Sequence, residues 1–160
     1  MDYHEMVDLL KERFPEAIQD YKVFREELTI DVDYKSLIPV CTFLRDEEPF
    51  KMDVLTDLAG LDFGKEASPR FGVSYLLTST DNVFRVRVKI YFDEGTEIES
   101  VSNIWKSAEW PEREAWEMFG INFVNHPDLR KLLLPDEFDG YPLRKDFPTK
   151  GFHFEEPFRA

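Results

Sequence analysis

Ionisable side chains that could carry chemistry gather between residues 112 and 128. Glu112, Glu114 and His126 are the residue types that general acid–base catalysis uses, and together with Asp128 they are also types that bind metal ions. The same side chains can instead hold an irregular segment of chain against a partner protein. The spacing of these residues and the motifs around them separate the three possibilities.

The spacing disfavours a metal site. The chain has no His-x-x-x-His pair and no Cys/His quartet, and His4 and His153 lie near its two ends. Cys41 is the only cysteine, whereas an iron–sulfur cluster is usually held by several thiolates. We therefore expect no metal, flavin or cluster in this chain. A single cysteine in an apolar run also indicates a buried side chain and a reducing compartment.

Catalysis by the chain alone is disfavoured by the motifs that are missing. There are seven glycines but no GxGxxG fingerprint, no Gly-Lys-Ser/Thr phosphate loop and no nucleophile motif. A stand-alone acid–base enzyme that uses Glu114 and His126 stays open as an alternative hypothesis. A free acidic binding module is another.

A short helix is predicted to position the first of these side chains. Pro111 suits the start of a helix that ends at Gly120, which can adopt the left-handed C-terminal cap. Glu112 and Glu114 fall on different sides of this helix. Because one side must pack, we expect at least one of Glu112, Arg113 and Glu114 to be buried and charge-paired.

Two further short helices are predicted on either side of this one. Residues 100–110 read as a serine-capped helix start with aromatic anchors. After the extended His126-Pro127 step, Asp128 can cap a helix over residues 129–134, which Pro135 would end.

The remainder of the chain predicts an α+β domain. Apolar spacing indicates a helix over residues 6–14, and alternation indicates a half-buried strand over 27–34. Arg85, Arg87 and Lys89 form a basic stripe on one face of the last predicted strand, facing either acidic stripes such as Asp31 and Asp33 or a partner. The other predicted elements are a helix at 35–48, a strand at 51–63 and a hairpin of strands 71–79 and 83–92.

The end of the chain differs in character. Five of the ten prolines and many of the 15 phenylalanines lie beyond residue 120, where regular periodicity ends. Proline removes backbone donors, yet the aromatic side chains still need burial. We therefore predict a domain over residues 1–135 and an extended arm over 136–160 that lies along neighbouring subunits, with residues 143–146 pairing with charges there.

The charge of the chain excludes some partners. A formal net charge of −13 opposes binding to nucleic acid and to anionic membranes. No apolar run is long enough to span a bilayer. From the residues alone the chain is an acidic α+β subunit without chemistry of its own.

Residues 108–148, "AEWPEREAWEMFGINFVNHPDLRKLLLPDEFDGYPLRKDFP", closely resemble the signature region of the 30 kDa subunit, also called the C subunit, of NADH:quinone oxidoreductase, respiratory complex I. Tyr141 and Asn125 depart from the usual family pattern. Residues 1–107 fit the family only in the order of their elements. The matching residues, which we expect to be structural or to contact other subunits, are Glu112, Arg113, Glu114, Met118, Phe119, Gly120, Ile121, His126, Pro127, Asp128, Leu129, Arg130, Pro142, Leu143, Arg144, Lys145 and Asp146.

The resemblance implies a two-layer α+β fold with helices on one side of a mainly antiparallel sheet. It implies a non-catalytic place in the peripheral arm, on the cytoplasmic side of the bacterial inner membrane, packed against the quinone-pocket subunit of the 49 kDa type. FMN, iron–sulfur clusters and quinone are expected in partner subunits, and the whole complex is expected to pump protons. A related membrane-bound hydrogenase-type complex, which uses a similar subunit, is the alternative.

Overall fold

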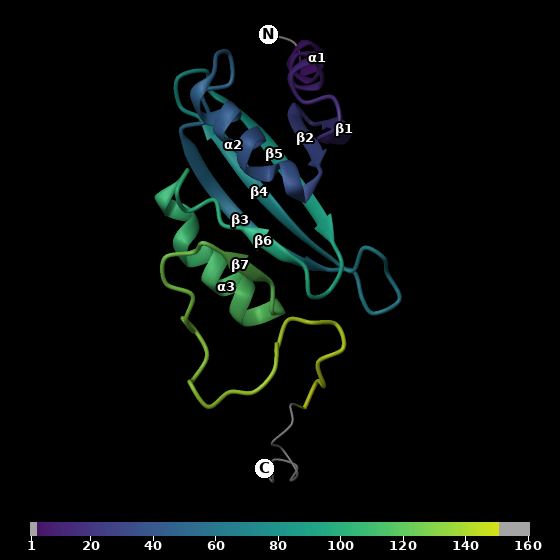
Figure 1. The fold of residues 1–160 in the computed structure, drawn as a ribbon, viewed down its shortest axis with the longest axis vertical. Helices are drawn as coiled ribbons and strands as arrows, with labels where there is room; N and C mark the ends of the chain where they lie inside the picture. Colours follow the sequence, from purple (N-terminus) through teal and green to yellow (C-terminus); the bar gives the residue numbers. More distant parts are fainter. Residues whose placement is uncertain (1–2, 151–160) are drawn as a thin grey trace.

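The computed structural model describes residues 3–150, in which helices pack against one face of a five-stranded sheet (Figure 1). The strand order is β1-β2-β5-β4-β3, and every neighbouring pair is antiparallel except β2 with β5. The expected two-layer α+β fold with a mainly antiparallel sheet is confirmed. The strands are β1 (Ile18–Phe24), β2 (Glu27–Val32), β3 (Val54–Asp62), β4 (Phe71–Ser79) and β5 (Phe84–Phe92).

Two helices in the first third of the chain follow their apolar spacing. Helix α1 (Tyr3–Arg13) ends before Pro15 and buries three apolar side chains against the sheet. Helix α2 (Leu37–Asp46) carries Pro39 in its first turn, where proline is tolerated. The buried side chain of Cys41 lies on α2, and burial raises the pKa of its thiol.

The basic stripe on β5 is largely satisfied by the neighbouring strand. Nη1 of Arg87 lies 2.7 Å from Oε1 of Glu27, and Lys89 is the register partner of Asp31. Cross-strand pairing is therefore confirmed for Arg87, while Lys89 lies beside Asp31 in the register. Asp33 is not part of it, because its side chain accepts a hydrogen bond from the backbone of Lys35.

The prediction that a serine-capped helix starts within residues 100–110 is wrong about where the helix begins and what caps it. A turn and a 3-10 helix (Lys106–Ala108) lead into helix α3 (Glu109–Phe119), whose N-cap Ala108 makes no side-chain cap bond. The hydroxyl of Ser100 is engaged instead by a buried carboxylate on α3. Beside α3, two short parallel strands, β6 (Glu97–Glu99) and β7 (Asn122–Val124), form a second sheet.

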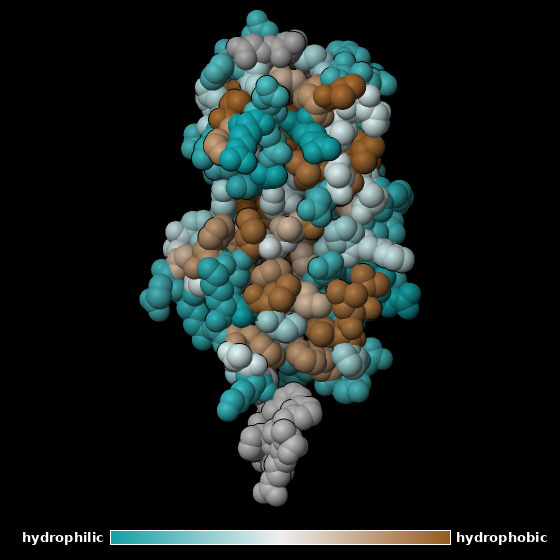
Figure 2. Space-filling view, turned by 180° about the vertical axis from the view of Figure 1, so that it is seen from behind, coloured by the Kyte–Doolittle hydropathy of each residue, from teal (hydrophilic) through white to brown (hydrophobic). Residues whose placement is uncertain are grey.

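Apolar side chains also reach the surface. Figure 2, which views the side opposite to Figure 1, shows hydrophobic patches interspersed with hydrophilic residues over the middle and lower part of the molecule. Between residues 3 and 150 no helix combines the length and the apolar character needed to cross a bilayer.

Candidate functional site

Helix α3 lies between strand β3 and the irregular segment that follows β7 (Figure 1). Three of its charged side chains are buried, with Glu112 0% exposed, Glu117 3% and Arg113 9%. Buried charges are rare unless their hydrogen-bonding capacity is met. The partners of these three side chains therefore show what the helix is built to hold.

The carboxylate of Glu117 holds a loop. It accepts the backbone N–H groups of Leu132, Leu133 and Leu134, at 3.0, 3.0 and 2.6 Å for the closest oxygen of each. Burial acts to raise the pKa of Glu117, but the three backbone donors outweigh it and keep that pKa below its ordinary value. The ionised carboxylate is therefore the form that binds the loop.

Arg113, one turn earlier, holds the same loop by its carbonyl groups. Its Nε donates to the carbonyl of Arg130 at 2.9 Å and its Nη2 to that of Lys131 at 3.0 Å. At least one of Glu112, Arg113 and Glu114 was predicted to be buried and charge-paired. Glu112 and Arg113 are both buried, but Arg113 supplies no charge pair, since its partners are carbonyl groups. We refer to residues 130–134 as the clamped loop.

The helix predicted over residues 129–134 is absent, because side chains of α3 already satisfy its backbone groups. Asp128 does not cap a helix. Its backbone N–H donates to Nδ1 of His126 and its carboxylate pairs with the exposed Arg130 at 2.9 Å. Pro127 is exposed at the start of this irregular segment.

Glu112 points to the other side of α3 and closes a buried polar cluster. Ser100 Oγ donates to its Oε2, and the backbone N–H of Val101 donates to its Oε1 at 2.8 Å. Burial raises the pKa of Glu112 to about 7, against the effect of these two donors. The cluster ties α3 to the turn that precedes it.

His126 is held by backbone groups on both ring nitrogens. Nε2 donates to the carbonyl of Glu109 at 2.9 Å, and Nδ1 accepts the N–H of Asp128 at 3.0 Å. This is the bonding pattern of a neutral imidazole with its proton on Nε2. Both nitrogens are thus engaged by backbone groups, and Glu114 is exposed on α3.

The segment after the clamped loop is fastened to the end of α3. Gly120 adopts φ +73° there, as predicted, and a Cβ in its place would lie 2.6 Å from Nη2 of Arg144. Nε of Arg144 donates to the carbonyl of Phe119 at 2.6 Å, and its Nη1 pairs with Glu94. The backbone N–H of Leu143 donates to the carbonyl of Met118 at 3.1 Å.

Asp146 completes this attachment through Arg70, a cation whose side chain is 8% exposed. Arg70 contacts Asp146 at 2.8 Å and Asp62 at 3.2 Å, while the N–H of Lys145 donates to Asp62 at 2.8 Å. Residues 143–146 were predicted to pair with charges on neighbouring subunits. For Arg144 and Asp146 this is wrong, because Arg144 pairs with Glu94 and Asp146 pairs with Arg70 and Lys65 of the same chain. The division at residue 135 stays a prediction, and residues 151–160 of the predicted arm lie outside the described residues.

Four large apolar side chains of this region are exposed among polar ones. Each exposed side chain of this region is on α3 or on a segment fastened to it, and a groove of about 260 Å³ runs between β3 and α3 beside Leu143. We call this the α3 surface. Its members are Trp110 at 66% exposure, Leu133 at 61%, Leu143 at 53% and Tyr141 at 40%.

The acidic and histidine side chains of residues 3–150 are not arranged as a metal site. Within residues 3–150 no group of three or more His, Cys, Asp or Glu side chains could hold a metal ion.

The sequence analysis did not predict the structural roles of four polar residues, Glu117, Ser100, Asp62 and Arg70. The sequence feature that could have pointed to Glu117 is its distance of four residues from Arg113. That spacing ordinarily indicates a side-chain pair within the helix.

Comparisons with known proteins point to one family. The family model described as "Respiratory-chain NADH dehydrogenase, 30 Kd subunit" matches residues 30–153. The C subunit of the NADH-quinone oxidoreductase of Hyphomonas neptunium is 40% identical over 97% of this chain and 77% of its own length. The same subunit of Brucella ovis is 44% identical over 92% and 73%, and that of Geobacter sulfurreducens is 41% identical over 94% and 92%.

Solved structures share the fold. The trypsin-resistant fragment of Nqo5 has a TM-score of 0.63 and 26% identity, over 78% of this chain and 98% of the fragment. A chain of the membrane-bound sulfane sulfur reductase, an archaeal respiratory membrane complex, has a TM-score of 0.75 over 91% of this chain and 85% of its own. At 24% identity the second likeness shows the fold alone.

Proposed function

The chain belongs to the family of the 30 kDa subunit of respiratory-chain NADH dehydrogenase, and on that premise we propose that the α3 surface docks it onto the quinone-pocket subunit. The chain is a subunit of NADH-quinone oxidoreductase, as its relatives of 40–44% identity are. It contributes packing, and the complex that it supports carries electrons from NADH to quinone.

The proposal extends to the place and the cofactors of the chain. It sits peripherally on the cytoplasmic side of the membrane, held there through other subunits of a proton-translocating complex. It carries no cofactor itself, and FMN, iron–sulfur clusters and quinone are bound by its partners. The chemistry of its buried groups supports this, since the ring nitrogens of His126 and the carboxylate of Glu117 are engaged by the backbone.

The clamped loop carries the docking proposal. Arg113 and Glu117 form hydrogen bonds to the backbone of the clamped loop. The side chain of Leu133 on this loop points outward and is 61% exposed. Holding an apolar side chain rigidly at the surface reduces the ordering cost of binding. Exposed tryptophan, tyrosine and leucine side chains on one rigid support have the composition of an interface core.

Two other functions have less support. The sulfane sulfur reductase likeness shows that another respiratory complex uses this fold, but the relatives with high identity are subunits of NADH-quinone oxidoreductase. A stand-alone acid–base enzyme needs Glu114 and His126 to act on one substrate. Glu114 is exposed, and both nitrogens of His126 are bonded to backbone groups.

Leu133→Asp tests the docking surface. A carboxylate at this exposed position leaves the clamp intact, so the melting temperature of the isolated chain should change little. Buried in an apolar interface, the same carboxylate should reduce the quinone-pocket subunit that co-purifies with the tagged chain in mild detergent by about tenfold or more. Val54→Asp, at another exposed apolar position on β3, is the matched control and should co-purify as the wild type does.

The readout separates the surface from the identity of the partner. If Leu133→Asp retains the quinone-pocket subunit but loses a different subunit, the α3 surface faces that other subunit. If Leu133→Asp co-purifies the whole complex at the wild-type level, the α3 surface is not an interface.

A further inference from the structure

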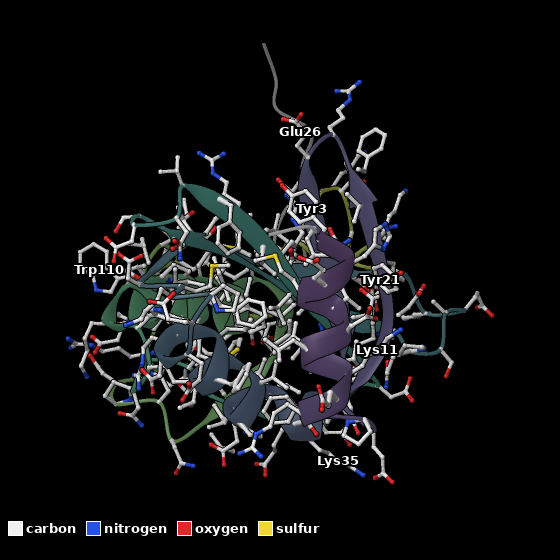
Figure 3. All side chains as sticks on the ribbon, turned by 90° about the horizontal axis from the view of Figure 1, so that it is seen from above. Tyr3, Lys11, Tyr21, Glu26, Lys35 and Trp110 are labelled. Carbon is white, nitrogen blue, oxygen red and sulfur yellow. The ribbon has the colours of Figure 1, made fainter. Side chains whose placement is uncertain are left out.

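A second surface lies where two hairpin turns meet. Because β2 and β5 run parallel, the β1–β2 turn and the β4–β5 turn lie at the same end of the sheet. A hollow of about 570 Å³ opens between them, and its lining includes Arg25, Val83 and Arg85 as well as Glu26 and Glu27. We call Phe24, Arg25, Val83 and Arg85 the hairpin-end surface. In Figure 3, Glu26 and Tyr3 mark this end of the molecule, and Trp110 of the α3 surface lies apart from them at the left edge.

The two arginines of this surface lack carboxylate partners. Among residues 3–150 no carboxylate lies within ion-pair distance of Arg25 or Arg85, and the guanidinium of Arg25 lies over the ring of Phe24 at 5.2 Å. Arg87, on the same face of β5 as Arg85, forms an ion pair with Glu27 at 2.7 Å. In a chain with 33 acidic and 20 basic side chains, unpaired exposed arginines indicate an anionic group supplied from outside.

The apolar members of the surface are unusually placed. Val83 is 86% exposed and has φ +52°, in the left-handed region that β-branched residues rarely occupy. Phe24 is 60% exposed. Strained backbone persists where the surroundings or a function maintain it, and this turn has little covering it from the chain itself. Arginine beside exposed aromatic and aliphatic side chains is the composition of a protein interface.

We propose that the hairpin-end surface binds an acidic segment of another subunit of the complex. Carboxylates of that segment pair with Arg25 and Arg85, and one of its apolar side chains packs on Phe24 and Val83. Nucleic acid and anionic lipid are polyanions that the net charge of −13 repels, whereas a short protein segment brings only a few charges. The surface is separate from the α3 surface, so this inference holds whichever partner packs on α3.

Photo-crosslinking from Val83 in the assembled complex tests the proposal. Benzoylphenylalanine placed at residue 83 should crosslink to a peptide of another subunit in which Asp and Glu outnumber Lys and Arg. The yield should fall several-fold between ~50 mM and ~500 mM NaCl, because exposed charge pairs are screened. Charge reversal by Arg25→Glu with Arg85→Glu should reduce the yield about tenfold, while Arg25→Lys with Arg85→Lys should retain most of it. Arg13→Glu, an exposed charge reversal at the end of α1, is the matched control and should leave the yield unchanged.

The remaining outcomes also decide the matter. If the double charge reversal prevents assembly while the isolated full chain melts as the wild type does, the surface is an interface and the proposal stands. A double reversal that unfolds the isolated chain would show a structural role for the arginines and overturn it. So would a crosslink to lipid, to nucleic acid or to a peptide without acidic excess, or a fully assembled complex in which residue 83 crosslinks to no other chain.

Discussion

Oε2 of Glu112 lies 3.8 Å from Nε2 of His126, with both side chains buried. Nε2 of His126 is directed to the carbonyl of Glu109, and its Nδ1 accepts the N–H of Asp128, so this bonding pattern leaves no ion pair between the two side chains. The carboxyl group of Glu112 therefore has no buried cation to stabilise its charge, which accounts for the strong effect of burial on its pKa.

Replacing this carboxyl should change how stability depends on pH. Burial raises the pKa of Glu112 from its ordinary value of 4.5 to about 7, so the folded state binds more protons than the unfolded state between these values. Its contribution to stability is full below the unfolded pKa and is lost as pH rises through about 7. The stability of the wild type relative to Glu112→Gln should fall by about 2–3 kcal/mol from pH 5 to pH 8 in urea unfolding. The exposed Glu114→Gln is the control, and an equal pH dependence of both variants would contradict the assignment.

Glu117 should be essential to the clamped loop. Glu117→Gln keeps the size of the side chain but removes the charge and one acceptor oxygen from a group that serves three backbone donors. Hydrogen bonds to a charged group contribute about 1.5–3 kcal/mol each, so we expect a loss of stability on that scale. Amide hydrogen exchange at residues 132–134 should accelerate, whereas Glu114→Gln on the same helix should leave it unchanged. Unaltered exchange in Glu117→Gln would show that the loop does not depend on this carboxylate.

Arg70 should hold residues 143–146 to the sheet. Arg70→Ala removes the cation from Asp62, whose side chain is 0% exposed, and also removes the less exposed of the two cations that contact Asp146. Breaking a buried pair from one side costs about 3–5 kcal/mol, and trypsin should then cleave faster after Arg144 and Lys145.

Lys65→Ala is the control for Arg70, because Lys65 contacts the same Asp146 from a side chain that is 63% exposed. Exposed pairs contribute about 0–1 kcal/mol, so its stability and its cleavage rate should stay close to those of the wild type. Equal stability and equal cleavage rates of the two variants would show that Arg70 does not hold residues 143–146 to the sheet.

A methyl group at Gly120 should disturb the attachment of the following segment. Both Gly120 and Gly95 have positive φ, at +73° and +84°, so an alanine at either position meets a backbone cost of about 1–2 kcal/mol. At Gly95 nothing lies within 4 Å of the added Cβ, whereas at Gly120 it would lie 2.6 Å from Arg144 and from Tyr141. Gly120→Ala should therefore be the less stable variant and should exchange faster at residues 141–144. Equal melting temperatures would show that Arg144 and Tyr141 move aside without cost.

Local patterns were sufficient to predict most elements of this fold. Alternation along residues 27–32 and 84–92, apolar spacing in α1 and α2, and the left-handed cap at Gly120 all appear where the residues indicate them. Side-chain periodicity depends on residues close together in the sequence, so it can be recognised without knowing how distant segments pack. The sequence was also sufficient to predict that at least one of Glu112, Arg113 and Glu114 is buried, since a short helix that packs on one side cannot expose them all.

Only the tertiary structure decided the partners of the charged side chains. Arg113 and Glu117 have the spacing of a pair within a helix, yet both bind the clamped loop. Residues 144–146 contact Asp62, Glu94 and Arg70 of the same chain. Every buried donor and acceptor must be satisfied, but backbone groups, side chains and partners can each satisfy them, and residue order does not rank these choices. The packing of α3 against segments distant in sequence brought one set of partners within reach, and that set determined which residues remain exposed for docking.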